Sequence, residues 1–362
     1  MNMSELKLGN LVAKFPIIQG GMGIGVSLSG LASAVANQGG IGVISAACIG
    51  FREPDIHSNF LEANKRALRN EIRKAKELTK GILGVNIMVA MSNFADMVKT
   101  SIEEGIDVIF CGAGLPLTLP EFLHPSSHTK LVPIVSSARA AKLIAKKWVD
   151  KYQYVPDAFV VEGPLAGGHL GFQKEQISDP TYSLEQLVKE VISEVKPLEE
   201  AHQRQIPVIA AGGIYSGEDI YRFLSLGASG VQMATRFVAT EECDASLNFK
   251  LAYVNAKQEE IGIVQSPVGM PGRAITNSFM HDVTAGKTKP KQCPFHCIKT
   301  CDYQNSPYCI SVALINAQKG FTDRGLLFVG QNAYKVKEII SVKQLFETLT
   351  KEYAEYAAIA SV

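Results

Sequence analysis

The chain has 362 residues, of which 46% are hydrophobic and 20% charged, and its formal net charge is +1. This composition is typical of a folded globular protein, and the lack of a basic field argues against binding to nucleic acid or to a membrane surface. The first residues contain no continuous apolar segment, and no apolar run approaches the about 20 residues that cross a bilayer. We therefore expect a cytoplasmic protein without a signal peptide or a membrane span.

Short apolar runs rich in β-branched residues recur through the first two thirds of the chain. They lie at residues 16–19, 41–45, 82–88, 106–110, 131–136, 157–162, 206–211 and 229–233. Their almost continuous hydrophobicity is typical of parallel strands that are buried on both faces.

Helical patterns separate these runs, at residues 27–38, 58–79, 92–103, 137–151, 183–200 and 216–226. Ser27 and Ser216 stand where N-cap residues are expected, and Gly227 follows the last of these helices. Eight strands that alternate with helices predict an α/β fold, a (β/α)₈ barrel of the TIM type, over residues 1–240.

The alternation of strands and helices stops near residue 240. Residues 241–362 hold further helical patterns, a turn-rich stretch at 266–273 and a cysteine-containing segment. We predict that they form a C-terminal extension that packs on the barrel and does not fold as a separate domain. The stretch 266–273 is either a lid over the site or a surface connection.

In (β/α)₈ barrels the active site lies at the C-terminal ends of the strands. The glycine-rich loop at 20–25 follows the first strand and either lets backbone approach a flat ligand or is simply flexible. Gly212 and Gly213 follow the seventh strand, and Thr235 follows the eighth. Loops at these two positions frequently bind phosphate through backbone N–H groups, and the adjacent Arg236 either adds charge or forms a structural ion pair.

Two other polar side chains stand at the ends of predicted strands. His169 lies in a loop of small residues, where little packing requires an imidazole, and an imidazole can hold or transfer a proton near neutral pH. Asn86 follows the third strand and either hydrogen-bonds a ligand or forms a turn.

The segments PIIQGGMGIG, GVNIM, VVEGPLAGGHLG, PVIAAGGI and GASGVQMATRF together resemble the nitronate monooxygenase family and its relatives, the FMN-dependent enoyl-ACP reductases. The resemblance covers about residues 10–240 and implies a barrel that binds FMN. It implies that His169 is the catalytic residue, as a base or as a group that orients the substrate. The cofactor contacts that we predict from it are Gly21, Met22, Gly23, Asn86, Glu162, Gly168, Ala211, Gly212, Gly213, Met233, Ala234 and Thr235.

The resemblance implies oxidation of a small-molecule substrate, an alkyl nitronate, through the flavin. An NAD(P)H-dependent reductase of an acyl thioester and a flavin- or metal-binding protein without turnover are the alternatives, and a homodimer is compatible with each. Leu165 stands where many family members have Glu, and Ala234 stands where Gly is common. These departures affect the choice of substrate more than the choice of cofactor.

Four of the seven cysteines lie close together in sequence, within residues 293–309. Cys293, Cys297, Cys301 and Cys309 have the spacing C-x3-C-x3-C-x7-C, with His296 among them. In a reducing compartment this spacing predicts a site for zinc or an iron–sulfur cluster, with free structural or redox-active thiols as the alternative.

Overall fold

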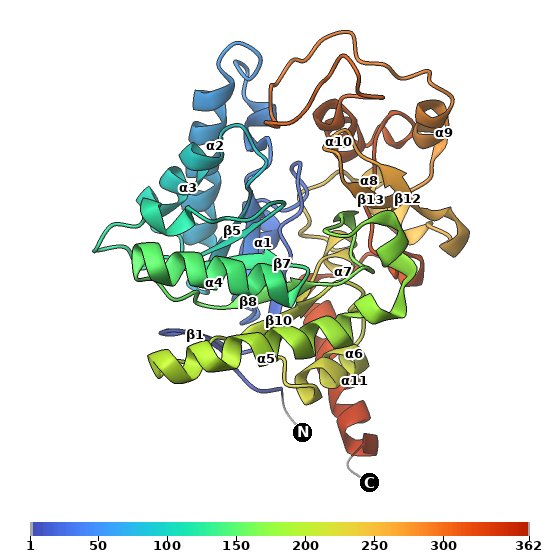
Figure 1. The fold of residues 1–362 in the computed structure, drawn as a ribbon. Helices are drawn as coiled ribbons and strands as arrows, with labels where there is room; N and C mark the ends of the chain where they lie inside the picture. The colour runs from blue at the N-terminus through green and yellow to red at the C-terminus, as the bar shows by residue number, and fades with distance from the viewer. Residues whose placement is uncertain (1–2, 361–362) are drawn as a thin grey trace.

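The computed structural model describes residues 3–360, and its centre is an eight-stranded parallel sheet (Figure 1). In chain order the strands are β3 (Ile17–Gln19), β4 (Gly42–Ser45), β5 (Leu83–Met88), β6 (Val108–Gly112), β7 (Lys130–Val135), β8 (Phe159–Glu162), β10 (Val208–Ala211) and β11 (Gly230–Met233). Their order in the sheet is β3-β11-β10-β8-β7-β6-β5-β4, so neighbours in the sheet are mostly neighbours in sequence. Every strand predicted from the sequence is present.

The sheet closes on itself between β3 and β4. Ile18 and Ile41 form a parallel bridge, the Gln19 N–H donates to the Ile41 carbonyl at 3.0 Å, and the Ile41 N–H donates to the Ile17 carbonyl at 3.0 Å. Closure pairs the two edge strands with each other. The predicted α/β barrel of the TIM type is confirmed.

Successive residues of most strands pack in two different apolar cores. Val160 and Ile209 belong to the core inside the barrel, whereas Val161 and Ala210 belong to the core between the strands and the surrounding helices. Side chains alternate between the two faces of a strand, so burial of both faces requires the nearly continuous hydrophobic runs seen in the sequence.

Helices cover the outside of the barrel: α1 (Ser29–Asn37), α2 (Phe60–Leu78), α3 (Phe94–Glu103), α4 (Ala138–Tyr152), α5 (Leu184–His202) and α6 (Gly217–Ser225). The predicted N-cap of α6 is confirmed, since the Ser216 hydroxyl accepts from the Asp219 N–H at 3.2 Å. The predicted N-cap of α1 is wrong: Leu28 holds that position, and the Ser27 hydroxyl accepts from the Met22 N–H at 2.7 Å instead. Within residues 3–360, no helix combines the length and hydrophobicity of a membrane span.

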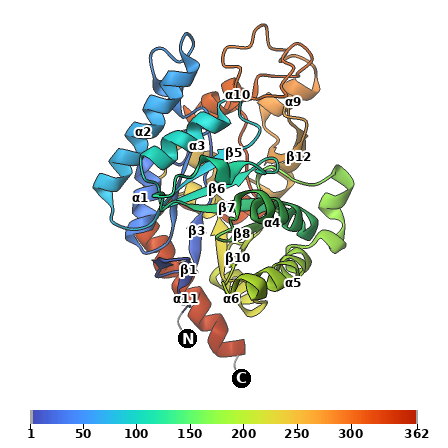
Figure 2. The ribbon, with the colours of Figure 1, turned by 60° about the vertical axis from the view of Figure 1, so that its left-hand side comes forward.

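A short antiparallel hairpin that the sequence did not predict precedes the barrel. It consists of β1 (Leu6–Leu8) and β2 (Leu11–Ala13). Leu6 and Leu8 are buried in the core inside the barrel. Figure 2 shows β1 at the end of the barrel near both termini, opposite α9 and α10. The hairpin therefore closes the end of the barrel away from the site described below.

The C-terminal elements lie along one side of the barrel (Figure 1). They are α8 (Leu247–Val254), β12 (Ile261–Gln265), β13 (Pro271–Ile275), α9 (Ser278–Thr284), α10 (Ile310–Gln318) and α11 (Val342–Ala360), and the short α7 (Thr235–Val238) connects β11 to them. β12, β13 and the two-residue β9 (Gly168–His169) form a small antiparallel sheet, and α11 packs on α6 and α1. The description of residues 241–362 as one extension, without a domain of its own, stays a prediction.

Candidate active site

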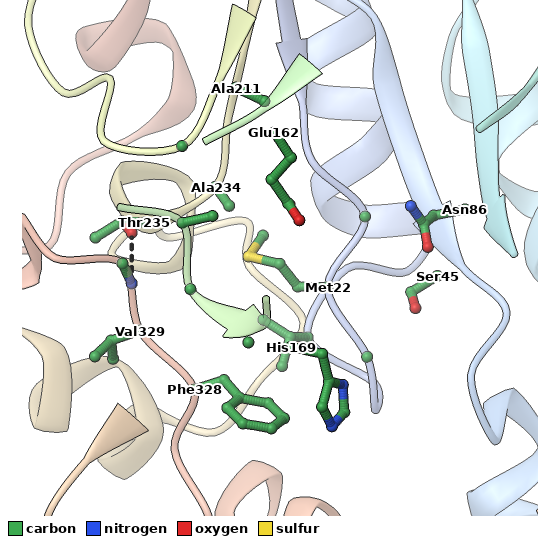
Figure 3. A pocket seen from close by; sticks show the side chains of 18 of the residues that line it. Met22, Ser45, Asn86, Glu162, His169, Ala211, Ala234, Thr235, Phe328 and Val329 are labelled. Atoms are coloured by element: carbon green, nitrogen blue, oxygen red, sulfur yellow. Dashed lines mark hydrogen bonds between the residues drawn. The ribbon is translucent and has the colours of Figure 1, made fainter. Parts of the chain in front are cut away.

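A cavity opens at the C-terminal ends of the barrel strands (Figure 3). Its lining includes the predicted catalytic residue, His169, and every predicted cofactor contact: Gly21, Met22, Gly23, Asn86, Glu162, Gly168, Ala211, Gly212, Gly213, Met233, Ala234 and Thr235. Most of these residues lie on or directly after β3, β5, β8, β10 and β11, and Gly168 and His169 form β9 in the segment after β8. The fold thus brings all of them to one place, while their binding of FMN stays a prediction.

The glycines of the loop after β3 allow it to pack closely against the barrel wall. A Cβ atom on Gly21 would lie 2.4 Å from the Cβ of Asn86, and one on Gly23 would lie 2.7 Å from the Cβ of Ala47. The Met22 side chain lies between Glu162 and His169 in the view of Figure 3. Tight packing is a third reason for these glycines, besides the ligand approach and the flexible loop that the sequence suggested.

One end of the cavity offers backbone N–H groups. Gly212 and Gly213 have φ of +91° and +86°, a left-handed conformation that favours glycine. Within residues 3–360, the N–H groups of Gly212, Gly213 and Thr235 donate to no other protein group. Thr235 begins α7, and its hydroxyl accepts from the Gly330 N–H at 3.3 Å (Figure 3). Several free amide donors at neighbouring loops suit a phosphate group.

Arg236 has a structural role and does not line the cavity. Its guanidinium lies 3.6 Å from the Glu352 carboxylate, donates to the Tyr215 carbonyl at 3.2 Å and stacks over the Tyr215 ring. These contacts connect α7 to α11 and to the loop before α6. Of the two interpretations that the sequence allowed, the ion pair is the one in the structure.

Glu162 is the last residue of β8, and its carboxyl group extends into the cavity (Figure 3). Burial raises the pKa of this carboxyl to about 7, because the charged form loses solvation. A carboxyl that is partly protonated near neutral pH can donate a hydrogen bond as well as accept one. Glu162 is therefore a versatile polar group on the barrel side of the cavity.

His169 is held by residues from the C-terminal part of the chain. Its Nε2 lies 2.7 Å from the Ser266 hydroxyl, and its ring packs edge-on against Phe328 with centroids 4.9 Å apart. Burial lowers the pKa of His169 to about 4, so the imidazole is neutral at physiological pH. A neutral imidazole has one ring nitrogen that donates and one that accepts.

Arg273 supports the loop that carries His169. Its buried guanidinium donates to the carbonyls of Pro164 and Ala166, at 2.6 and 2.7 Å. Burial lowers its pKa to about 10, which still leaves it charged at neutral pH, and within residues 3–360 it forms no ion pair with a carboxylate. Through Arg273, the stretch 266–273 holds this loop from outside the barrel, and its role as a lid or as a surface connection stays a prediction.

The sequence did not identify the apolar wall of the cavity, which comes from the C-terminal region. Its residues are Phe249, Tyr253, Leu314, Leu326, Phe328, Val329 and Gly330. Nothing in their local sequence distinguishes them from residues of an ordinary core. The only available signal was the presence of apolar residues in a region that lacks the strand–helix rhythm.

The predicted metal site at the cysteine segment is not supported. Within residues 3–360, no three His, Cys, Asp or Glu side chains are grouped so that they could hold a metal ion. The four thiols have different hydrogen-bonding partners: Cys293 accepts from the His296 N–H, Cys297 and Cys301 contact Ser311 and Ser306, and Cys309 precedes α10. All are free thiols, which was the alternative to zinc or iron–sulfur.

Known proteins resemble this chain over most of its length. The model of the family described as nitronate monooxygenase matches residues 4–352. A "Probable nitronate monooxygenase" of Staphylococcus saprophyticus is 28% identical over 308 residues, which cover 78% of this chain and 81% of that protein. An indene-carboxyl-CoA dehydrogenase of Mycobacterium tuberculosis is 27% identical over 271 residues, 75% of this chain and 66% of that one. The solved structure of FabK from Thermotoga maritima has a TM-score of 0.74 and 29% identity, with 96% of both chains covered.

Proposed function

Because the chain belongs to the nitronate monooxygenase family and is an FMN-dependent oxidoreductase, we propose that its cavity binds FMN and oxidises small alkyl nitronates. One observation carries the proposal: a single cavity contains both a set of free amide donors and a neutral, oriented His169. The first feature suits the cofactor, and the second suits an anionic substrate.

The amide donors support FMN through its phosphate. Gly212, Gly213 and Thr235 would hold the phosphate with backbone N–H groups that no protein acceptor uses. Asn86 and Glu162 line the same cavity and would hydrogen-bond the polar edge of the ring system. When bound, FMN supplies the capacity to accept electrons from the substrate.

His169 is better suited to orienting the substrate than to removing a proton from it. The Val268 N–H donates to the Ser266 hydroxyl oxygen at 3.3 Å, and among the described residues Nε2 of His169 is the one acceptor for the hydroxyl hydrogen. If that hydrogen bond is made, the ring proton is on Nδ1, which is then a donor. A nitronate is already an anion and needs such a donor, whereas a base would have nothing to abstract.

Anaerobic mixing with an alkyl nitronate tests the proposal. The purified protein should be yellow, and the nitronate should bleach its flavin absorbance in one rapid phase. His169→Gln should slow this phase and leave the FMN content unchanged, since the phosphate end lies elsewhere in the cavity. A colourless protein that cannot be reconstituted with FMN would sink the proposal, and so would a flavin that nitronate leaves oxidised.

A second candidate function is NAD(P)H-dependent reduction of an acyl thioester. The similarity to FabK over 96% of the chain and to a carboxyl-CoA dehydrogenase supports it. The apolar wall formed by Phe249, Tyr253 and Phe328 also suits an acyl group. Two results together would favour this function over the first. NADH or NADPH should bleach the flavin rapidly and an enoyl thioester should reoxidise it, whereas an alkyl nitronate should leave the oxidised flavin unchanged.

A further inference from the structure

We propose that Cys48 and Cys297 form a redox-active dithiol, which a hydroperoxide oxidises to a disulfide. The two sulfur atoms come from opposite parts of the chain and meet beside the wall of the cavity. This site is independent of the proposed reaction, and neither FMN nor a metal ion takes part in it.

The two thiols share one hydrogen-bonding partner. The Sγ atoms of Cys48 and Cys297 lie 3.5 and 2.9 Å from the hydroxyl oxygen of Ser311, in the first turn of α10. Both side chains also pack in the same apolar cluster, which includes Ile24, Phe51 and Phe295. Besides sharing this oxygen, the two thiols hydrogen-bond each other, so their side chains are direct neighbours.

The two cysteines differ in exposure and in thiol pKa, as the two thiols of an exchange site do. Cys48 is buried, whereas Cys297 is partly exposed and can meet a small oxidant. A hydrogen bond with Cys48 lowers the pKa of Cys297 to about 7, and the same contact raises the pKa of Cys48. The start of α10 favours negative charge nearby. Cys297 is therefore the attacking thiolate, and Cys48 is the resolving thiol.

The chemistry balances with the hydroperoxide as the oxidant. The Cys297 thiolate attacks the peroxide, so that an S–O bond forms, the O–O bond breaks and an alcohol or water leaves after taking up a proton. The Cys48 sulfur then attacks the sulfenic sulfur, so that the S–S bond forms and the S–O bond breaks, with release of one water. Two thiols lose two electrons in all, and the hydroperoxide gains both.

The disulfide would fix one wall of the cavity. Ala47, which precedes Cys48, lines the cavity, and so does Leu314 in the turn of α10 after Ser311. Cys48 itself has φ of +44°, in the tight loop after β4. A bond between Cys48 and Cys297 would tie this barrel loop to the cysteine segment, and reduction would release it.

Peptide mapping of the yellow holoprotein tests this site without measuring turnover. After one equivalent of hydrogen peroxide, we expect the loss of two free thiols per chain and a non-reduced peptide pair that links Cys48 to Cys297, both reversed by dithiothreitol. In Cys48→Ala, dimedone should label Cys297, because its sulfenic acid cannot be resolved. In Cys297→Ser, Cys48 should stay reduced, and Cys243→Ser, which removes a buried thiol elsewhere, should behave as the unchanged protein.

Three outcomes would overturn the proposal. One is linkage of Cys297 to Cys293, Cys301 or Cys309 in place of Cys48. Another is oxidation of Cys297 alone to the sulfinic acid while Cys48 remains a free thiol. The third is zinc or iron in the purified protein that is lost when Cys297 becomes serine, since a metal-bound thiolate would not be free to react.

Discussion

The barrel and the C-terminal region build opposite sides of one cavity with different kinds of groups. The barrel side contributes free backbone amides and polar side chains, among them Gly212, Thr235 and Glu162, together with apolar side chains such as Met22 and Ile134. The C-terminal side contributes aromatic and aliphatic side chains, among them Tyr253 and Phe328. In the proposed function, the barrel would therefore bind the cofactor, and the later residues would shape the substrate side of the cavity.

His169 is the point at which the two regions depend on each other. Its position in the chain belongs to the barrel, but its hydrogen bond and its ring contact come from Ser266 and Phe328. The loop before it is held by Arg273. If this division of roles is right, changes on the C-terminal side should disturb His169 and the loop before it more than they disturb the phosphate end.

The largest effect should come from Arg273→Met. The carbonyls of Pro164 and Ala166 would each lose a charged donor inside the protein, at a cost of about 1–3 kcal/mol apiece. We expect the free energy of unfolding in urea to fall by about 2–6 kcal/mol. The control is Arg324→Met, because the Arg324 side chain is 78% exposed and, among the residues that the structure describes, its one ion pair is with the exposed Asp323. Equal stability of the two variants would show that the loop needs no support from outside the barrel.

Gly167→Ala should disturb the contact between the barrel and the C-terminal region at Val329 and Gly330. A Cβ atom on Gly167 would lie 2.5 Å from the Val329 carbonyl carbon and 2.6 Å from the Gly330 nitrogen. Backbone cannot turn aside as a side chain can, so we expect destabilisation of about 1–3 kcal/mol. The FMN dissociation constant should rise as well, because Gly330 also contacts Thr235.

Gly20→Ala is the matched control for this substitution. Gly20 is a buried glycine of the barrel side, and its added Cβ would meet nothing closer than 3.5 Å. Its stability should change by less than about 0.5 kcal/mol. If both glycine variants lose FMN equally, the contact between Gly167 and Gly330 has no special part in positioning Thr235 and the other groups that would bind the phosphate.

Ser266→Ala should separate the substrate side from the cofactor side. It removes the hydroxyl that orients His169, and we expect turnover to fall about tenfold, or about 1.4 kcal/mol in activation free energy. FMN affinity, measured by fluorescence titration, should stay unchanged, and Ser266→Thr should restore most of the activity. A joint loss of FMN binding and turnover would assign Ser266 a general structural role and contradict the division between the two regions.

The sequence predicted the barrel side well and the C-terminal side poorly, for a physical reason. Strands that are buried on both faces and glycines at φ near +90°, such as Gly212, leave marks on local sequence. Phe328 and Arg273 leave none, because their roles depend on contacts with residues more than 100 positions away. The cysteine spacing pointed to a metal, although the structure pairs Cys297 with Cys48, which is distant in sequence, through Ser311.

The smallest effect is a difference in how stability depends on pH. Between about pH 4.5 and 7, the folded protein keeps a proton on Glu162 that the unfolded chain releases, so this group makes stability fall as pH rises. Between about pH 4 and 6.5, the unfolded chain binds a proton on His169 that the folded protein excludes, so stability rises with pH. The two contributions oppose each other over the shared window and largely cancel.

Substitution of either residue should reveal the contribution of the other to the pH dependence of the free energy of unfolding, measured in flavin-free protein. Glu162→Gln should make the free energy of unfolding rise with pH, relative to the unchanged protein, between about pH 4.5 and 6.5. His169→Gln should make it fall, and each change is at most about 1.4 kcal/mol per pH unit and smaller where the cavity admits solvent. Adding Ser266→Ala to His169→Gln should leave the pH slope unchanged, since Ser266 acts on that slope only through the imidazole. A slope that changes again would mean that the C-terminal side influences Glu162 as well, and the two regions would then share the electrostatics of the cavity instead of dividing them.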